Sequence, residues 1–379
     1  MGNTAREPRF FVFLGSGASQ FAGYRTFVTF PQLIFDHHLR EQQGFPPLSP
    51  QVYQLLDAVR TSLANTVQPT TADNILRRLD NYRSLWNTVR QDPVLTSRIM
   101  RGVASWGNLA RFSQLTEDAI GAITITTVRH YSQNLIQEAR ASDPAHYEML
   151  RRLFALYRDL VVTNSQHLPV FTTNYDMLIE DLFSEFSRKR KDRIVLLNGF
   201  AGCQTEGGEW DDSLFHSKTG VPALHLYRLH GCVCWYYHGM GDEKVYFHRR
   251  DALQRRESYL CAIFAGRDFY RGLTPYSAGF ESLYKALLGS AVGIFIGFSF
   301  RDDEINHMLL SANLQRRTPL RLIVFDPVLA ATDVVANLTE SSKRTQFPVR
   351  LPRASDVTVI NSRFGEGDFD RQLNRALRI

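Results

Sequence analysis

The sequence is poor in cysteine and has no long apolar run. Only Cys203, Cys232, Cys234 and Cys261 occur among 379 residues. Four thiols at these spacings do not suggest a disulfide framework. No stretch approaches the roughly 18 uninterrupted apolar residues of a membrane span. The first nine residues contain no apolar core of the kind found in a signal peptide. We therefore expect a cytoplasmic protein that makes no membrane contact.

Charge of neither sign dominates, although there is a basic excess. The chain has 44 Lys and Arg against 38 Asp and Glu, a net charge of +6 and an isoelectric point near 9.2. The densest basic run, residues 188–191, follows an apolar helical pattern, so we interpret it as a helix end where cations suit the helix dipole. No recognised nucleic-acid-binding motif accompanies the run, so direct nucleic-acid binding stays open.

Six short apolar runs indicate buried strands. They lie at 10–14, 168–172, 193–197, 225–229, 292–297 and 320–325. Nearly continuous apolar runs of this length are typical of parallel strands that are covered on both faces. Several are followed by Gly, Asn, Asp or Ser and then by a helical pattern. We predict an α/β fold with a Rossmann-like, mostly parallel sheet and helices on both faces, built from residues 1–47 and 165–379.

The segment 48–164 has a different pattern. Apolar residues recur every three or four positions over 52–63, 75–89 and 150–161, which is typical of amphipathic helices. We predict an all-helical insertion subdomain whose apolar stripes form its own core and whose outer surface is available for self-association. The segment 198–221 is rich in Gly, Asp and Glu, and we expect a long loop there.

The first apolar run ends in a glycine-rich turn, Phe11-Val-Phe-Leu-Gly-Ser-Gly-Ala-Ser19. Gly15 and Gly17 allow a tight turn and close approach of a pyrophosphate, while a following helix would add N–H groups and its dipole. The hydroxyls of Ser16 and Ser19 are candidate phosphate donors, and Ala18 keeps the turn compact. The spacing departs from the full dinucleotide-binding fingerprint.

Three more motifs end apolar runs: Phe171-Thr-Thr-Asn-Tyr-Asp176, Leu229-His-Gly231 and Ile294-Phe-Ile-Gly-Phe-Ser299. In an open α/β sheet, the carboxyl ends of the strands line the ligand crevice. The amide of Asn174 can position water or hydroxyls without adding charge, and His230 can act as a base near neutral pH. The alternatives are a helix cap for Asn174 and a buried structural imidazole for His230.

In this order, the four motifs resemble the sirtuin family of NAD-consuming enzymes. In that family a Thr-Gln-Asn-Ile-Asp segment supplies an asparagine and a later His-Gly supplies the base, so Asn174 and His230 are the implied catalytic residues. The implied NAD-binding residues are those of the matching motifs: Gly15, Ser16, Gly17, Ala18, Ser19, Arg25, Thr173, Asp176, Gly297, Ser299 and Asp326.

Several of these positions have a second interpretation. Residues 22–25, Ala-Gly-Tyr-Arg, fall where sirtuins carry a Gly-Ile-Pro-Asp-Phe-Arg lid, of which the glycine and Arg25 remain. Ser299 matches a phosphate or ribose contact but could cap the helix that we expect over 302–314. Asp302 and Asp303 suit the first turn of that helix. Asp326 could accept a ribose hydroxyl or belong to an Asp-Pro turn.

The chain departs from protein-deacylating sirtuins at their four-cysteine zinc module. Cys232-Val-Cys234 and the distant Cys261 do not make two C-x-x-C pairs, so no metal is predicted. A mixed site completed by His238 or His248 is the alternative. The chain therefore resembles the zinc-free, sirtuin-like branch found in bacterial antiphage systems.

This resemblance implies an NAD+ glycohydrolase, or NAD+ nucleosidase, that yields nicotinamide and ADP-ribose or cyclic ADP-ribose. It also implies that loss of NAD+ serves antiphage defence by abortive infection. We expect a homo-oligomer, and a separate activator such as a HerA-type hexameric ATPase or, alternatively, a short Argonaute. Two other functions remain open. One is a non-catalytic module that senses NAD or a derived nucleotide for a partner; the other is an NAD-dependent protein ADP-ribosyltransferase or deacylase.

Overall fold

The structure is a computed structural model, and its described residues form two compact units. Described are residues 9–25, 31–42, 45, 47–65, 72–91, 106–164, 167–187, 194–200, 208–215, 221–237, 245–247, 259–260, 274–344, 348–362, 364 and 367–378. Unit one comprises the described residues up to Tyr24 and from Ser132 onward, and unit two comprises those of Arg25–Tyr131.

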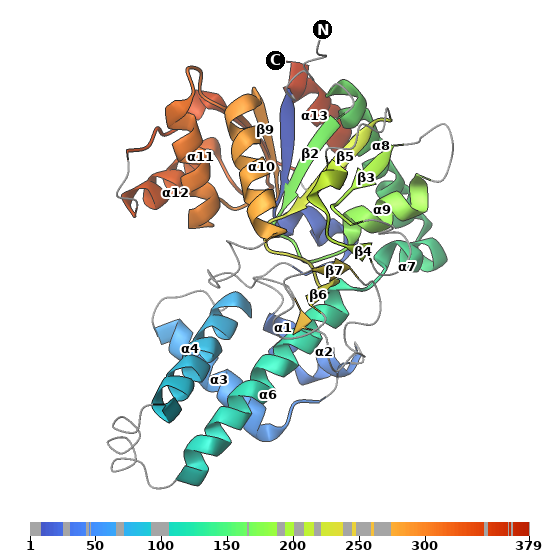
Figure 1. The fold of residues 1–379 in the computed structure, drawn as a ribbon. Helices are drawn as coiled ribbons and strands as arrows, with labels where there is room; N and C mark the ends of the chain where they lie inside the picture. The colour runs from blue at the N-terminus through green and yellow to red at the C-terminus, as the bar shows by residue number, and fades with distance from the viewer. Residues whose placement is uncertain are drawn as a thin grey trace. The chain divides into compact units, whose positions relative to one another are not determined.

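Unit one is built on a seven-stranded sheet in which every neighbouring pair of strands is parallel (Figure 1). The strand order is β11-β10-β9-β1-β2-β5-β3. The strands are β1 (Phe10–Leu14), β2 (His167–Thr172), β3 (Val195–Leu197), β5 (Ala223–Arg228), β9 (Val292–Ile296), β10 (Arg321–Phe325) and β11 (Val357–Ile360). The predicted Rossmann-like α/β fold is confirmed.

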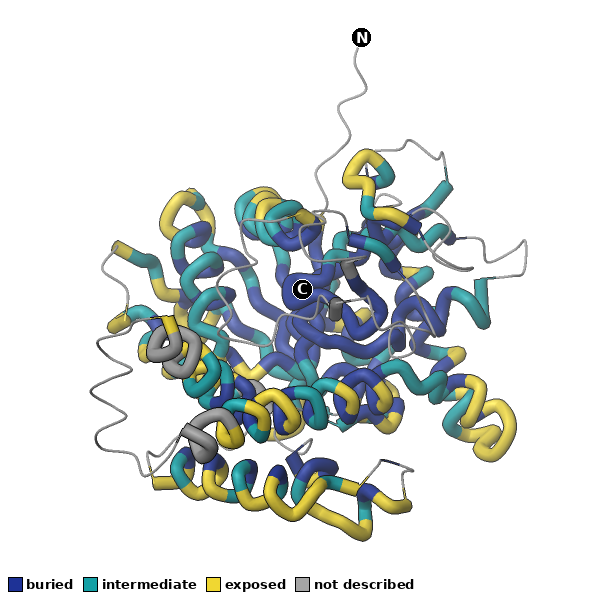
Figure 2. Tube along the Cα trace, turned by 60° about the horizontal axis from the view of Figure 1, so that its bottom comes forward, coloured by how far each residue is buried: buried dark blue, intermediate teal, exposed yellow. Residues whose placement is uncertain are grey.

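Helices cover both faces of this sheet, because successive strand side chains point to opposite sides. On one face, Phe11, Phe13 and Phe295 share a core with α10 (Tyr276–Gly289), α11 (Asp303–Gln315) and α12 (Ala331–Lys343). On the other, α8 (Pro144–Thr163) packs on β2 and β5, and α9 (Leu178–Phe186) packs on β3. Figure 2 shows the central strands as buried tube between these layers. The apolar runs therefore reflect burial from both sides.

The direction in which the chain adds strands to the sheet reverses at β1. The chain leaves β1 and returns through β2 on one side, whereas β9 and β10 follow on the other side. Ligands in open α/β sheets bind at such a reversal, outside the carboxyl ends of the strands. The glycine-rich turn after β1 and the loop after β9 meet at this point.

A small antiparallel sheet is also part of unit one. It consists of β4 (Gly208–Glu209), β7 (Tyr246–Phe247), β6 (Trp235–Tyr237) and β8 (Tyr259–Leu260). Around it the rings of Phe200, Trp210, Trp235 and Phe247 pack together, with centroids 5.4 to 6.0 Å apart. The expected loop over 198–221 therefore contains β4 and the 3₁₀-helix η3 (Asp212–Phe215), because its aromatic side chains find a core of their own.

Unit two is helical. It contains α1 (Pro31–Phe35), α2 (His37–Gln42), α3 (Pro50–Asn65), α4 (Ala72–Gln91) and α6 (Trp106–Tyr131), of which α3, α4 and α6 pack against one another. The described residues of 25–47, a segment that the sequence analysis grouped with the sheet, lie in this unit. Conversely, α7 (Leu135–Ser142) and α8 lie in unit one, because α8 is the helix that leads into β2 and packs on it.

Two further findings concern the surface. Among the described helices, none is both long and apolar enough to cross a bilayer. The basic run at 188–191 lies outside the described residues, two positions beyond the end of α9 at Phe186.

Candidate functional site

Close backbone packing explains the glycines at the ends of β1 and β9. Gly15 N–H donates to Ile296 O at 2.9 Å, and Gly17 N–H donates to Gly297 O at 3.1 Å. A Cβ on Gly15 would lie 2.4 Å from Gly297 O, and one on Gly297, whose φ is +61°, would lie 2.2 Å from Ala18 N. The turn then enters the 3₁₀-helix η1 (Ser16–Ala22). The two glycine amides are thus satisfied within the protein, so a phosphate here would be held by other groups.

Asn174 lies just beyond β2, where the motif predicted it, and hydrogen bonds hold its side-chain nitrogen Nδ2. Its Nδ2 donates to Gly15 O at 2.9 Å and to Ser19 Oγ at 3.1 Å, while its backbone N–H donates to Thr172 Oγ1 at 3.0 Å. Its Oδ1 is buried and accepts no hydrogen bond from any described residue. A buried amide oxygen without a donor is costly. The site therefore offers a pre-oriented acceptor for a hydroxyl or a water.

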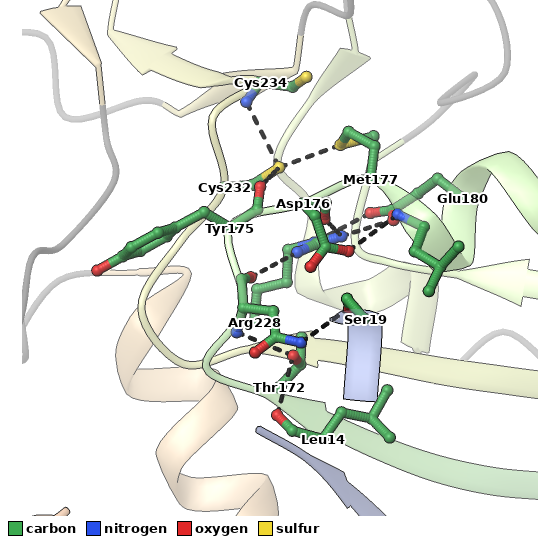
Figure 3. A network of polar contacts seen from close by, with 12 residues as sticks. Leu14, Ser19, Thr172, Tyr175, Asp176, Met177, Glu180, Arg228, Cys232 and Cys234 are labelled. Atoms are coloured by element: carbon green, nitrogen blue, oxygen red, sulfur yellow. Dashed lines mark hydrogen bonds and ion pairs between the residues drawn. The ribbon is translucent and has the colours of Figure 1, made fainter. Parts of the chain in front are cut away.

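Ser19 hydrogen-bonds both polar side chains of the Asn174 loop; Figure 3 shows Ser19 and Asp176 in this network. Its hydroxyl accepts from Asn174 Nδ2 and hydrogen-bonds the carboxylate of Asp176. Asp176 Oδ1 also accepts from Leu178 N at 3.0 Å, at the start of α9. The pKa of Asp176 is raised above its ordinary value, chiefly by burial. The charge of Arg228 and the hydrogen bonds from Ser19 and Leu178 lower this pKa but offset only part of the effect of burial. Ser19 is thus engaged in supporting Asn174, and the predicted phosphate contact would have to compete with these bonds.

A buried ion pair that sequence reasoning missed holds the same loop. Arg228, the last residue of β5, donates through Nε and Nη2 to the two carboxylate oxygens of Glu180 at 3.0 and 2.6 Å. Its guanidinium also reaches the main-chain oxygens of Asn174 at 2.9 Å and Asp176 at 2.6 Å. The exposed fractions of the two side chains are 2% and 4%. The available signal was an arginine at the end of an apolar run, directly before Leu229-His-Gly231.

His230 lies in the turn after β5 and is almost buried, with 9% of its surface exposed. Its Nε2 is 3.6 Å from Asp302 Oδ2. Asp302 is the N-cap of α11, since its Oδ1 accepts from Glu304 N and Ile305 N. The predicted first-turn role of Asp302 is therefore confirmed, and the alternative of Ser299 as the cap of this helix is wrong.

The two described cysteines lie behind the Asn174 loop as buried thiols. Cys232 Sγ is 3.2 Å from Met177 Sδ and 3.6 Å from Tyr175 O, and Cys234 N–H donates to Cys232 Sγ at 3.4 Å. The contact with Cys232 and burial raise the pKa of the Cys234 thiol. Within the described ranges, no group of three or more His, Cys, Asp or Glu side chains could hold a metal ion. Cys203, Cys261, His238 and His248 lie outside those ranges.

The remaining predicted residues take up separate positions. Thr173 is buried beside Asn174, and its N–H donates to Leu14 O at 3.3 Å. Ser299 O accepts from Asn337 Nδ2 at 3.0 Å. Asp326 Oδ1 accepts hydrogen bonds from Val328 N at 2.8 Å and from Leu329 N at 3.0 Å, as expected for an Asp-Pro turn. Arg25 lies in unit two, with its guanidinium on Gln32.

The structure therefore brings part of the predicted set together. Gly15, Ser19, Asn174 and Asp176 form one hydrogen-bonded cluster, while Gly17 and Ala18 pack against Gly297. The predicted contacts of Ser16, Ser299, Asp326 and Arg25 with a nucleotide stay predictions.

Comparison with known families gives one match. Residues 169–342 match the family model described as a SIR2-like domain. The match begins in β2 and ends in α12, so it contains Asn174, Arg228, His230 and Asp302 but leaves out the turn after β1. No curated protein matches the chain. The match supports a sirtuin-like family and an activity related to NAD.

Proposed function

Because SIR2-like domains use NAD, we propose that this protein is an NAD+ glycohydrolase that releases nicotinamide and ADP-ribose. The observation that carries the proposal is the state of Asn174. Its Nδ2 is held by two acceptors while its buried Oδ1 has no donor among the described residues. An enzyme that must orient a water or a ribose hydroxyl benefits from an acceptor that is fixed before the substrate binds.

The reaction needs little covalent assistance from the protein. The bond between the ribose C1′ and the nicotinamide nitrogen breaks, and its electron pair neutralises the positive charge of the pyridinium. Water forms the new C–O bond at C1′ and loses one proton, so NAD+ and water give ADP-ribose, nicotinamide and a proton. The protein must stabilise a cationic sugar and bring the nucleophile to one face of it.

The described residues suit these tasks. Asn174 Oδ1 would accept a hydrogen bond from the attacking water or from a ribose hydroxyl. His230 would take the proton of that water, as a histidine can near neutral pH. The cyclic product would arise at the same site if the adenine of the substrate replaced water as the nucleophile. The turn after β1 and the loops after β9 and β10 would hold the rest of the dinucleotide.

We further propose that NAD+ depletion by this protein serves antiphage defence. The support is the resemblance of its motifs to zinc-free, sirtuin-like domains of bacterial antiphage systems. The same resemblance supports a homo-oligomer and a separate activator, with a HerA-type hexameric ATPase as the first candidate and a short Argonaute as the second. Co-purification with the products of neighbouring genes tests this part independently of the chemistry.

The test of the activity follows NAD+, nicotinamide and ADP-ribose by chromatography. The wild type is compared with Asn174→Ala and His230→Ala, each alone and in lysate that contains the neighbouring gene products. We expect turnover by the wild type and a loss of about 100-fold or more in each variant. His307→Ala is the matched control, because His307 lies on α11 with its Nε2 on Ser341 O at 3.1 Å.

Retained turnover in Asn174→Ala would contradict the assigned role of the amide. Binding of NAD+ by the wild type without turnover, even with the neighbouring gene products present, would replace the glycohydrolase by a nucleotide-sensing module. Transfer of ADP-ribose to protein in place of its release would identify a transferase.

A further inference from the structure

The two carboxylate oxygens of Asp302 contact different groups: one caps α11, and the other lies near His230. Oδ1 accepts from Glu304 N at 3.0 Å and from Ile305 N at 3.2 Å, which caps α11. Oδ2 is 3.6 Å from Nε2 of His230. The cap fixes the orientation of the carboxylate, since both amides belong to the first turn of a helix. The second oxygen is therefore held toward the imidazole before any ligand arrives.

The position of this pair in the fold links it to Asn174. His230 follows β5 and Asp302 follows β9, and β1 and β2 lie between these two strands in the sheet. The contact therefore connects two loops across the ends of β1 and β2. Those are the strand ends that carry Gly15 and Asn174. The His230–Asp302 contact therefore lies at the same end of the sheet as the Asn174 acceptor.

The loop that carries Asp302 is held in an unusual conformation. Phe300, two residues earlier, has φ of +55°, which is rare for a bulky residue. Its ring is buried against Phe295 and Phe298, with centroids 5.1 and 5.0 Å away. Its main-chain oxygen accepts from Asn306 Nδ2 at 2.9 Å. Packing on both sides thus keeps the loop in place and leaves Asp302 little freedom to move away from His230.

We propose that Asp302 is a positioning residue that holds the His230 imidazole and favours its protonated form during the reaction. This inference rests on the proposed function, in which His230 takes a proton from water. A carboxylate close to an imidazole stabilises the imidazolium, so it makes the ring a better proton acceptor. The proton that His230 accepts later passes to solvent.

Other charged groups near the pair have their own partners. Arg228, two residues before His230, is bound to Glu180 and to the main chain of the Asn174 loop. Asp176 hydrogen-bonds Ser19 and Leu178. Asp303, next to Asp302, accepts from Ser341 Oγ and from Arg344 Nη1, both at 2.7 Å. Asp303 therefore supplies a matched control for the loss of one carboxylate charge from the same helical turn.

The experiment compares Asp302→Asn with Asp303→Asn in the full chain. Asparagine is a good N-cap and keeps the volume of aspartate, so Asp302→Asn should fold. Two readouts are taken: the pH profile of kcat/KM for NAD+ hydrolysis, and the titration of the His230 ring followed by NMR on histidine-labelled protein. His230→Gln identifies the ring signal. Neither readout would move if Asp302 only capped α11.

We expect Asp302→Asn to move the acid limb of the profile and the His230 titration to lower pH by about 0.5–1 unit. Its plateau kcat should fall by about tenfold with little change in KM. Asp303→Asn should leave both readouts at the wild-type values. Unchanged titration in Asp302→Asn, or equal shifts in both variants, would overturn the inference. If the wild type does not hydrolyse NAD+, the proposed function fails, while the NMR titration still decides whether the two residues are coupled.

Discussion

Arg228 Nη1 donates a hydrogen bond of 2.9 Å to the main-chain oxygen of Asn174. The same guanidinium holds both carboxylate oxygens of Glu180, so a buried charge pair supports the backbone of the loop that presents the Asn174 amide. An arginine can bind two oxygens in a fixed plane and still donate to others, which a lysine cannot do. The geometry of the candidate site therefore depends on a pair that need not touch substrate.

Glu180→Gln tests this dependence. It removes the carboxylate that is paired with the buried Arg228 guanidinium, and removing one partner of a buried pair costs about 3–5 kcal/mol of the free energy of unfolding. Urea unfolding measures the loss. Glu148→Gln, at an exposed pair with Arg151, is the control and should change stability little. A variant Glu180→Gln as stable as the wild type would show that the pair does not hold the loop.

Ser19→Ala should lower both the catalytic rate and the stability of the fold. The substitution removes the hydroxyl that accepts from Asn174 Nδ2 and hydrogen-bonds Asp176. Asn174 Nδ2 keeps its hydrogen bond to Gly15 O, so the side-chain amide becomes more mobile but stays attached to the turn after β1. We expect kcat for NAD+ hydrolysis to fall by about tenfold and the free energy of unfolding to fall by about 1–2 kcal/mol.

Ser16→Ala distinguishes this role from phosphate binding. Ser16 is a predicted phosphate donor, so its loss should raise KM and leave kcat near the wild-type value. Steady-state kinetics of both variants separates the two effects. A rise in KM alone for Ser19→Ala would assign Ser19 to the phosphate and not to the support of Asn174.

Gly297→Ala should disrupt the contact between the ends of β1 and β9. The new Cβ would lie 2.2 Å from Ala18 N, and the φ of +61° disfavours any residue with a side chain. We expect a loss of about 2 kcal/mol or more in the free energy of unfolding, measured by urea.

Gly121→Ala is the matched control for this substitution. Gly121 lies inside α6, and a Cβ there would meet no described atom within 4 Å. Alanine in an open helix position should raise stability by about 0.5–1 kcal/mol. Equal effects of the two alanines would contradict the close packing of Gly297.

The sequence could reveal the strands and the candidate catalytic pair because both depend on local signals. Short apolar runs located β1, β2, β9 and β10, and the motifs at their ends located Asn174 and His230. The strand β11 was missed because it lies at the sheet edge, where three of its four residues are half-buried and Thr358 interrupts its apolar residues. An edge strand of this kind has no continuous apolar run.

The long-range partners could not be found in the same way. Glu180 lies 48 positions before Arg228, and Asp302 lies 72 positions beyond His230 (302 minus 230). Local periodicity says nothing of which polar groups meet across strand ends. The sequence also could not show which groups the amides of Gly15 and Gly17 bind. A Gly-x-Gly turn allows close approach either of a phosphate or, as between Gly15 and Gly297, of the end of another strand.

The stability of unit two should fall in acid through His130. Its Nε2 accepts a hydrogen bond of 3.0 Å from Arg25 N, which requires the neutral imidazole. Burial, and then the charge of Arg25, lowers the pKa of His130 from 6.5 to about 4. Below pH 6.5, His130 binds a proton in the unfolded chain but stays neutral in the folded protein until the pH approaches about 4. The contribution of neutral His130 to the free energy of unfolding is therefore fully present above pH 6.5. It is lost as the pH falls toward about 4, and the total loss is about 3 kcal/mol.

Urea unfolding between pH 7.5 and 4.5 measures this loss as a difference between variants. His130→Gln keeps an oxygen that can accept from Arg25 N but does not titrate, so its free energy of unfolding should fall less steeply with acid than that of the wild type. His38→Gln, at an exposed position of α2, is the control and should keep the wild-type slope. Parallel curves for the wild type and His130→Gln would mean that the folded protein binds a proton at His130 as readily as the unfolded chain does, which would contradict the lowered pKa.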